Sequence, residues 1–335
     1  MTKPWILCLL AAVYTLSLTN CASPAHAPDE KYYLVATNLK VPYWQDAAAG
    51  LNRAASAMQV KAEMAGPDNF DPNAEHQQFQ DLIKSKPSGI LVSVSDAKIL
   101  GPDIDAAIAA GIPVITVDSD APGSKRLEFI GTDNYKAGVM AAKVAVDKLG
   151  GKGNVIIYTM PTQENLIDRM RGYRDVLGSH PGIKIVETID IKGDPGIAYD
   201  RTEKSIREKE KVDAFFCLEA IACPEVADVI ERKQATGKVV VAMDTDERTL
   251  KAIQKGTITA TVGQKPFTMA YVGVRALDDL HHHPLQNMSV DFSKDLFSPM
   301  PEFVDTGATL IDKSNVEQFL QARSAATAGN APAKK

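Results

Sequence analysis

The feature that most constrains the fold is an internal repeat. Residues 110–120 (AGIPVITVDSD) correspond to residues 236–246 (TGKVVVAMDTD), which follow 126 positions later. In each copy a run of apolar residues ends at an aspartate, Asp118 in the first copy and Asp244 in the second. The repeat therefore predicts two similar lobes rather than one large sheet.

The chain between the repeats alternates short apolar runs with segments of helical period. Strands that are apolar along their whole length are covered on both faces, as in parallel sheets that lie between helices. The pattern predicts an α/β fold of two doubly wound parallel-sheet lobes. The expected strands are Tyr32–Thr37, Val60–Ala65, Gly89–Val94, Pro113–Asp118, Phe129–Gly131, Asn154–Thr159, Ile183–Ile191, Ala214–Cys217, Val239–Met243 and Thr259–Gly263.

The two aspartates are the first candidates for a binding site. In doubly wound sheets, ligands bind beyond the carboxyl ends of the strands. Two facing lobes would place Asp118 and Asp244 on opposite walls of one cleft. The alternative is that each aspartate only caps the helix that follows it, which is a common role for this residue.

No set of catalytic residues stands out. No glycine-rich phosphate loop follows the first expected strand, and no G-x-S-x-G motif occurs. The run His281–His283 could suggest a metal site, but a solvated turn before Pro284 is the favoured interpretation. The net charge of −5 offers no basic surface for nucleic acid. We expect a binding protein that is not an enzyme, with no cofactor, no metal and no nucleic-acid partner.

Aromatic residues beside the first strand favour a polyhydroxylated ligand. Tyr43 and Trp44 follow that strand, and flat aromatic faces pack against the C–H face of a sugar ring. Tyr43 could instead be a core residue between the lobes. The carboxylates of Asp118 and Asp244 can each accept two hydroxyl donors.

Two carboxylates in a closed cleft require a cation nearby. Arg169 and Arg171 are the candidates, although Arg171 could equally be a solvated helix residue. Arg169 would also supply a planar set of donors, and Gln264 offers both a donor and an acceptor.

The first twenty residues have the pattern of a secretory signal, with Lys3 followed by an apolar stretch too short to span a membrane. Residues 18–21 (LTNC) resemble a bacterial lipobox, in which Cys21 would be lipidated, although Asn20 is unusual there. Cleavage after Ala27 is the alternative. In both cases we expect the mature protein in the periplasm or on the extracytoplasmic face of the membrane.

Cys217 and Cys223 remain after the signal and the candidate anchor are set aside. An oxidising compartment permits a disulfide between them. Two buried free thiols are the alternative, and too few further ligands lie nearby for a zinc site.

Six motifs, in their order and spacing, resemble the bacterial periplasmic sugar-binding proteins of the ribose-binding type. These proteins are the solute receptors of ABC sugar importers, and the resemblance covers nearly all of residues 31–325. The motifs are Asn38–Trp44, Thr116–Asp120, Ile130–Asn134, Arg169–Tyr173, Val241–Asp244 and Ala260–Pro266.

The resemblance implies which residues bind the sugar. Three positions depart from the ribose binders: Val41 replaces an asparagine, Ser119 an arginine and Glu219 a further asparagine. A site that pairs particular hydroxyls rejects analogues lacking them, so we expect a ligand other than ribose. Another pentose, a hexose, a polyol or a furanosyl signalling molecule remains open. The implied ligand-binding residues are Tyr43, Trp44, Asp118, Arg169, Glu219, Asp244 and Gln264.

The resemblance also implies that the two lobes close around a hinge of three crossing segments. The closed form would be recognised by the permease subunits of an ABC transporter, or alternatively by a chemotaxis or sensor protein. We expect a monomer, bound to the membrane only through a lipid on Cys21. The expected crossings lie near Gly131–Asn134, Val262–Pro266 and Asp291–Ser298. The expected regions are a signal (1–20), a linker (21–30), an N-terminal lobe (31–132 and 266–294), a C-terminal lobe (133–265 and 295–323) and a disordered tail (324–335).

Overall fold

The computed structural model describes residues 26–286, 291 and 297–329, and for residues 325–329 it describes the backbone alone. The expected signal peptide and the candidate lipidation site Cys21 lie outside these residues. None of the helices in the described part of the chain is long and apolar enough to cross a membrane.

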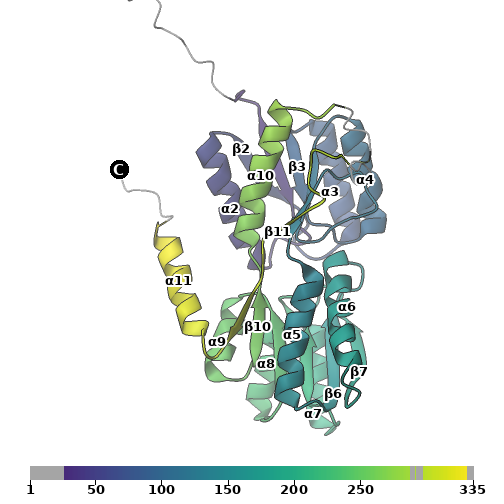
Figure 1. Ribbon diagram of the computed structural model, residues 1–335, viewed down its shortest axis with the longest axis vertical. Coiled ribbons are helices and arrows are strands. Elements are labelled where there is room, and N and C mark those ends of the chain that lie inside the picture. Colours follow the sequence, from purple (N-terminus) through teal and green to yellow (C-terminus); the bar gives the residue numbers. More distant parts are fainter. Residues whose placement is uncertain (1–25, 287–290, 292–296, 330–335) are drawn as a thin grey trace, which may run out of the picture.

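The chain forms two α/β lobes, one above the other in Figure 1, and each has its own apolar core. Ten strands match those expected from the sequence. The N lobe contains a fully parallel sheet in the order β11-β5-β4-β3-β1-β2. Its strands are β1 (Lys31–Val35), β2 (Lys61–Ala65), β3 (Gly89–Val92), β4 (Val114–Val117), β5 (Phe129–Gly131) and β11 (Phe303–Asp305). Its helices are α2 (Tyr43–Met58), α3 (Pro72–Ser85), α4 (Ala97–Ala109) and α10 (Pro266–His282).

The C lobe repeats this plan with the sheet order β12-β10-β9-β8-β6-β7, in which only β12 is antiparallel to its neighbour. Its strands are β6 (Gly153–Thr159), β7 (Ile183–Asp190), β8 (Ala214–Cys217), β9 (Val239–Met243), β10 (Ala260–Gly263) and β12 (Thr309–Asp312). Its helices are α5 (Asn134–Leu149), α6 (Glu164–Gly178), α7 (Pro195–Arg207), α8 (Ala222–Lys233), α9 (Glu247–Lys255) and α11 (Val316–Gly329). In each lobe, helices cover both faces of the sheet (Figure 1).

Local sequence signals explain where several helices begin. The residue before each of five helices is an aspartate whose side chain accepts a hydrogen bond from a backbone N–H of the first turn. These caps are Asp71, Asp96, Asp133, Asp194 and Asp246. Neither Asp118 nor Asp244 is among them, so the interpretation of these two residues as helix caps is wrong.

The chain crosses between the lobes three times. The first two crossings follow β5 and β10, whereas the third lies between β11 and β12, at residues 306–308. The expected position of this crossing, near Asp291–Ser298, is wrong because β11 pairs with β5 in the N lobe. The boundary between residues 294 and 295 therefore falls too early. Both strands were missed because they are short and lack a long apolar run: β11 is mostly exposed, and β12 has only Leu310 and Ile311 as consecutive apolar residues.

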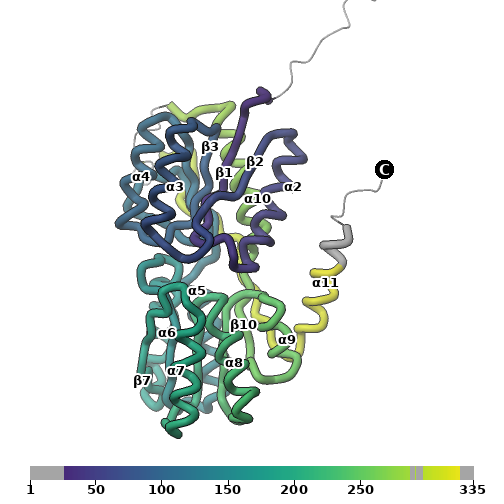
Figure 2. The backbone as a smooth tube through the Cα atoms, turned by 180° about the vertical axis from the view of Figure 1, so that it is seen from behind, coloured from purple at the N-terminus to yellow at the C-terminus, as the bar shows by residue number. Residues whose placement is uncertain are grey.

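The C-terminal tail also differs from the expectation. Helix α11 continues to Gly329, so the prediction of disorder from Ser324 onwards is wrong up to that residue. The segment is rich in alanine, the strongest helix former, and needs no apolar period to remain helical. Viewed from behind in Figure 2, α11 rises from the C lobe towards the side of the N lobe that carries α2.

Cys217, at the end of β8, and Cys223, in the first turn of α8, form a disulfide in the structure. Both residues are buried in the core of the C lobe. The bridge therefore fixes the turn between β8 and α8, which contains Glu219.

Candidate functional site

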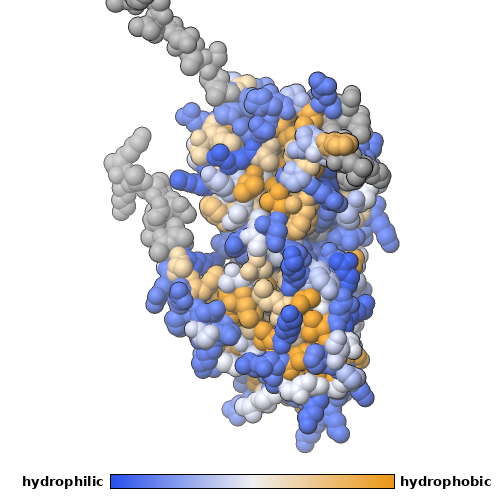
Figure 3. Space-filling view, viewed as in Figure 1, coloured by the Kyte–Doolittle hydropathy of each residue, from blue (hydrophilic) through white to orange (hydrophobic). Residues whose placement is uncertain are grey.

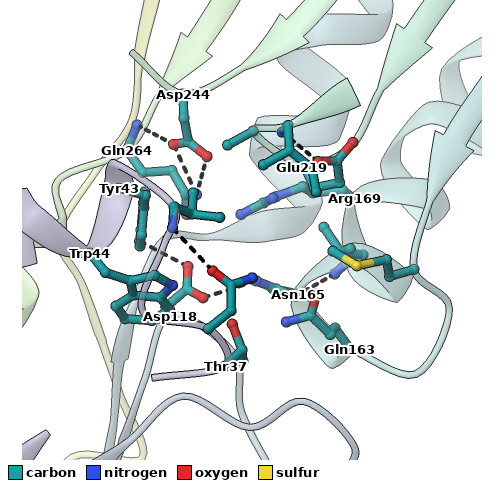
Figure 4. Close-up of a pocket in the computed structure, with 16 residues that line it drawn as sticks. Thr37, Tyr43, Trp44, Asp118, Gln163, Asn165, Arg169, Glu219, Asp244 and Gln264 are labelled. Carbon is teal, nitrogen blue, oxygen red and sulfur yellow. Dashed lines mark hydrogen bonds between the residues drawn. The ribbon is translucent and has the colours of Figure 1, made fainter. Parts of the chain in front are cut away.

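A pocket lies between the lobes, at the carboxyl ends of both sheets (Figure 4). All seven ligand-binding candidates from the sequence line it, and they come from both lobes. The lining residues are Thr37, Asn38, Val41, Tyr43, Trp44, Asp118, Met160, Gln163, Asn165, Leu166, Arg169, Glu219, Ala220, Ile221, Asp244 and Gln264.

The two repeated aspartates share one backbone conformation. Asp118 directly follows β4 and Asp244 directly follows β9, with φ values of 61° and 66°. This left-handed region is unfavourable for most residues, but aspartate tolerates it. The shared turn points both carboxylates into the pocket, one from each lobe (Figure 4).

Asp118 is surrounded by neutral donors. The Tyr43 hydroxyl donates to Oδ1 at 2.8 Å, and the Ser93 hydroxyl donates to Oδ2 at 3.0 Å. Asn165 of the C lobe reaches across the pocket and donates to Oδ2 at 3.4 Å. Burial raises the pKa of Asp118, and the positive charge of Arg169 opposes this shift.

Asp244 has fewer protein donors. The Gln264 amide Nε2 donates to both carboxylate oxygens, at 3.1 and 3.2 Å, and the Gln264 backbone N–H lies 3.4 Å from Oδ1. Burial raises the pKa of Asp244 to about 6; Arg169 opposes the shift and the charge of Asp118 adds to it. At neutral pH Asp244 is therefore ionised, with lone pairs available to a ligand.

Glu219 is buried in the pocket wall, but the start of α8 holds its carboxylate. The backbone N–H groups of Ile221 and Ala222 donate to it, at 2.5 and 3.2 Å. Burial raises the pKa of Glu219 to about 7, although these two hydrogen bonds oppose the shift. Its carboxylate thus shapes the turn as well as the pocket.

Arg169 is the cation of the pocket, and Arg171 is not. Arg169 is 2% exposed, and it donates from Nε to Asn134 Oδ1 at 2.9 Å and from Nη1 to the Leu218 carbonyl at 2.6 Å. Its third nitrogen, Nη2, has no partner among the described residues. Arg171 lies on the outside of α6, paired with Asp168, which agrees with the solvated alternative.

Two aromatic rings form one wall of the pocket. Tyr43 and Trp44 lie edge to face, with ring centroids 5.1 Å apart, at the start of α2. Trp44 packs in the N-lobe core, while Tyr43 packs partly against that core and directs its hydroxyl to Asp118. The pair thus presents aromatic surface to the pocket and orients one of its carboxylates.

The sequence analysis missed Thr37, Asn38, Gln163 and Asn165, which also line the pocket. Asn165 precedes Arg169 by four positions, so a helix places both on one face. That spacing is visible in the sequence and could have identified Asn165. Of the three departures from ribose binders, Val41 and Glu219 line the pocket, whereas the buried Ser119 does not.

The lobes touch beside the pocket as well as through Asp118 and Asn165. Gly193 of the C lobe lies against Phe70 of the N lobe so closely that a Cβ on Gly193 would collide with Cβ of Phe70. On another side, Arg323 of α11 forms an ion pair of 3.1 Å with Asp46 of α2. The structure therefore represents a closed arrangement of the lobes.

Two α/β lobes that close over a polar pocket at their strand ends define a solute-binding protein. Residues 32–282 match the family model described as periplasmic binding protein domain, and the chain belongs to this family.

Among curated proteins, the chain is similar to the ribose import binding protein of Bacillus subtilis, with 23% identity over 82% of this chain and 93% of the relative. It is also similar to the D-allose-binding periplasmic protein of Escherichia coli, with 25% identity over 74% of this chain and 84% of the relative.

The chain is also similar to solved structures of sugar-binding and solute-binding proteins. The arabinose-binding protein AraP of Geobacillus stearothermophilus is 31% identical, with a TM-score of 0.71 over 87% of this chain and 99% of that one. An ABC transporter solute-binding protein of Burkholderia graminis, solved with D-arabinose, is 29% identical, with a TM-score of 0.78 over 87% of this chain and 97% of that one.

Proposed function

We propose that this protein captures a monosaccharide or a related polyol between its lobes, outside the cytoplasm, and delivers it to an ABC importer. One observation carries the proposal. Arg169 Nη2 and Gln264 Oε1 are buried in residues that line the pocket and have no partner among the described residues. A ligand that both accepts and donates hydrogen bonds, as hydroxyl groups do, would satisfy both atoms.

The rest of the pocket suits the same ligand class. Asp244 offers free acceptor positions, and the rings of Tyr43 and Trp44 offer a surface for the C–H face of a sugar. The relatives described above are named for ribose, allose and arabinose. The family consists of binding proteins, and we propose that this member likewise performs no chemistry on its ligand.

The location and the partners are also part of the proposal. We propose a monomer in the periplasm or on the extracytoplasmic face of the membrane, with Cys21 as a lipid anchor. A receptor that feeds a chemotaxis or sensor protein would use the same pocket. Uptake of labelled ligand by a strain that lacks this protein separates these two functions. Uptake should be lost if the protein is the receptor of an importer, and it should persist if the protein serves a sensor.

The intrinsic fluorescence of Trp44 tests the sugar site. The protein has two tryptophans, so a chain of residues 22–335 retains Trp44 alone. Because Trp44 lines the pocket, titration with pentoses, hexoses and polyols should change its emission in a saturable way with at least one of them. A full panel that changes neither the emission nor the thermal unfolding midpoint would contradict the proposal.

Two arginines on one helix provide a matched control. Arg169→Lys removes the unpartnered Nη2 but keeps a positive charge, and it should weaken binding by about tenfold or more, since a charge-assisted hydrogen bond is worth about 1.5–3 kcal/mol. Arg171→Ala changes an exposed residue and should leave the affinity unchanged. Equal effects of the two substitutions would show that the pocket is not the site.

A further inference from the structure

Four potential metal ligands meet at the end of the N lobe that lies away from the pocket. His26 and Glu30 precede β1, and Asp278 and His282 lie in the last turns of α10. One ligand atom from each residue lies within 4.8 Å of the other three. In Figure 1 the chain enters the N lobe beside this end of α10, and Figure 3 shows mostly hydrophilic side chains there.

The separations of these atoms suit a single small cation. His26 Nε2 lies 3.1 and 3.3 Å from the two oxygens of Asp278. His282 Nε2 lies 3.2 Å from Glu30 Oε2 and 3.8 Å from Asp278 Oδ1. Ligand atoms at the corners of a tetrahedron around zinc, with bonds of about 2.0–2.1 Å, are roughly 3.3 Å apart. The separations of His26 from Asp278 and of His282 from Glu30 and Asp278 are thus close to those a bound metal would impose, and the remaining ones do not exceed 4.8 Å.

Hydrogen bonds from outside the cluster orient both carboxylates. The Tyr32 hydroxyl donates to Asp278 Oδ1 at 3.0 Å, and the Ala27 backbone N–H donates to Glu30 Oε1 at 2.5 Å. In Glu30, Oε1 is held by the fold and Oε2 faces His282. In Asp278, Oδ1 accepts from Tyr32 and is also the oxygen nearer to His26 and His282, so Tyr32 orients the oxygen that faces the cluster. Outer partners of this kind are typical of metal-binding residues and tune their affinity.

The charges of the cluster also favour a bound cation. Glu30 is 6% exposed and Asp278 is mostly buried, so two carboxylates face each other out of bulk water. Among the described residues, no lysine or arginine forms an ion pair with either of them. Nearby Lys31 pairs with Glu63, and Lys61 donates to the Pro28 carbonyl.

We propose that His26, Glu30, Asp278 and His282 bind one divalent transition-metal ion of the zinc class. Two imidazole nitrogens and two carboxylate oxygens form a complete tetrahedral set, so the ion is structural rather than catalytic. The lipid anchor proposed above places cleavage before Cys21, which retains His26, whereas cleavage after Ala27 would remove it. In the retained form the metal joins the segment of residues 26–30 to the end of α10, some 250 positions later in the chain. It fixes the N-terminal segment to the N lobe and takes no part in the ligand pocket.

Calorimetric titration of residues 22–335, without a polyhistidine tag and after treatment with a chelator, tests the site with zinc chloride. We expect one equivalent of zinc to bind and the thermal unfolding midpoint to rise with zinc concentration. His26→Ala lies outside all helices and strands, so it should leave the fold intact while weakening zinc binding by tenfold or more. Tyr32→Phe, which removes an outer hydrogen bond, should weaken binding by about tenfold.

A neighbouring histidine is the matched control. His283 adjoins His282 but does not belong to the cluster, so His283→Ala should leave zinc binding unchanged. His281 is less suitable, because its ring lies edge-on to those of Tyr32 and His282. The proposal is overturned if the unsubstituted chain binds no zinc, or if His283→Ala weakens binding as much as His26→Ala does. The sugar titration of Trp44 should be the same with and without zinc, so the two proposals fail independently.

Discussion

Asp118 and Asp244 occupy equivalent places in the two lobes, yet their surroundings differ. Both follow a central strand in the left-handed conformation, and both face the same pocket. Asp118 accepts hydrogen bonds from Tyr43, Ser93 and Asn165, one of which comes from the opposite lobe. Among the residues that the structure describes, only Gln264 donates to the carboxylate of Asp244.

The difference indicates that the same backbone turn serves two different roles in the two lobes. The carboxylate of Asp118 is largely used by the protein, and through Asn165 it helps to hold the lobes together. The carboxylate of Asp244 keeps lone pairs for the ligand, and burial with only one protein donor raises its pKa to about 6. Repetition of the fold thus conserves the backbone turn, while the neighbours of each aspartate determine its use.

Replacing each aspartate with asparagine gives the largest expected effect, and asparagine also tolerates the left-handed conformation. Asp244→Asn should weaken sugar binding by about 10- to 100-fold, because charge-assisted hydrogen bonds of about 1.5–3 kcal/mol become neutral ones. Asp118→Asn should lower the free energy of unfolding by about 1–3 kcal/mol, because an amide NH₂ would face donors of the protein. Trp44 fluorescence measures the affinity, and urea unfolding measures the stability.

The proposed difference between Asp118 and Asp244 is wrong if the effects of the two substitutions on affinity and stability are exchanged. Asp244→Asn should change the stability less than Asp118→Asn does, and Asp118→Asn should change the affinity less than Asp244→Asn does. A larger loss of affinity for Asp118→Asn would show that the N lobe supplies the principal ligand carboxylate.

The pH dependence of sugar binding should follow Asp244. The ionised carboxylate accepts ligand hydroxyls, and a pKa of about 6 means that acidification protonates it. The affinity for the sugar should therefore reach its maximum by pH 7.5. Below pH 6 it should fall by up to about tenfold per pH unit, since a proton then competes with the ligand for the carboxylate. Fluorescence titrations between pH 5 and 8 measure this profile.

Two variants assign the titration. Asp244→Asn should flatten the profile. Glu219→Gln should keep the midpoint near pH 6, because burial raises the pKa of Glu219 to about 7 and its side chain is already mostly neutral there. If Glu219→Gln flattens the profile and Asp244→Asn does not, then Glu219 is the group that titrates, and the prediction is wrong.

The sequence predicts those features of the fold and the site that depend on local patterns, and not those that depend on contacts between distant segments. The repeat around Asp118 and Asp244 predicts two similar lobes and the pocket between them, since strand ends of parallel sheets gather at one edge. It cannot predict the partners of each aspartate, because Ser93 and Asn165 come from other strands and helices.

Long-range contacts explain the remaining differences. Strand β11 has no apolar run, and its place in the N lobe becomes clear only from its pairing with β5. The cluster of His26 and His282 joins residues at opposite ends of the chain, and the histidine run alone favoured a solvated turn. His283 lies just beyond α10 and is exposed, as expected, whereas the turn interpretation is wrong for His281 and His282, which belong to the last turn of α10.

The smallest expected effect concerns the contact between the lobes. Arg323 pairs with Asp46 across the cleft, and both side chains are about 40% exposed, so the pair should stabilise the closed arrangement by less than about 1 kcal/mol. Arg323→Ala should therefore weaken sugar binding by no more than a few-fold, and less at high salt. Arg323 also donates to the Thr245 carbonyl, at 2.8 Å, but it contacts neither ligand carboxylate. Arg323→Ala should therefore weaken the Asp118→Asn and Asp244→Asn variants by the same factor as the unsubstituted protein. Fluorescence titrations of the single and double variants measure these factors, and an effect confined to one aspartate variant would show that closure and the two carboxylates are not independent.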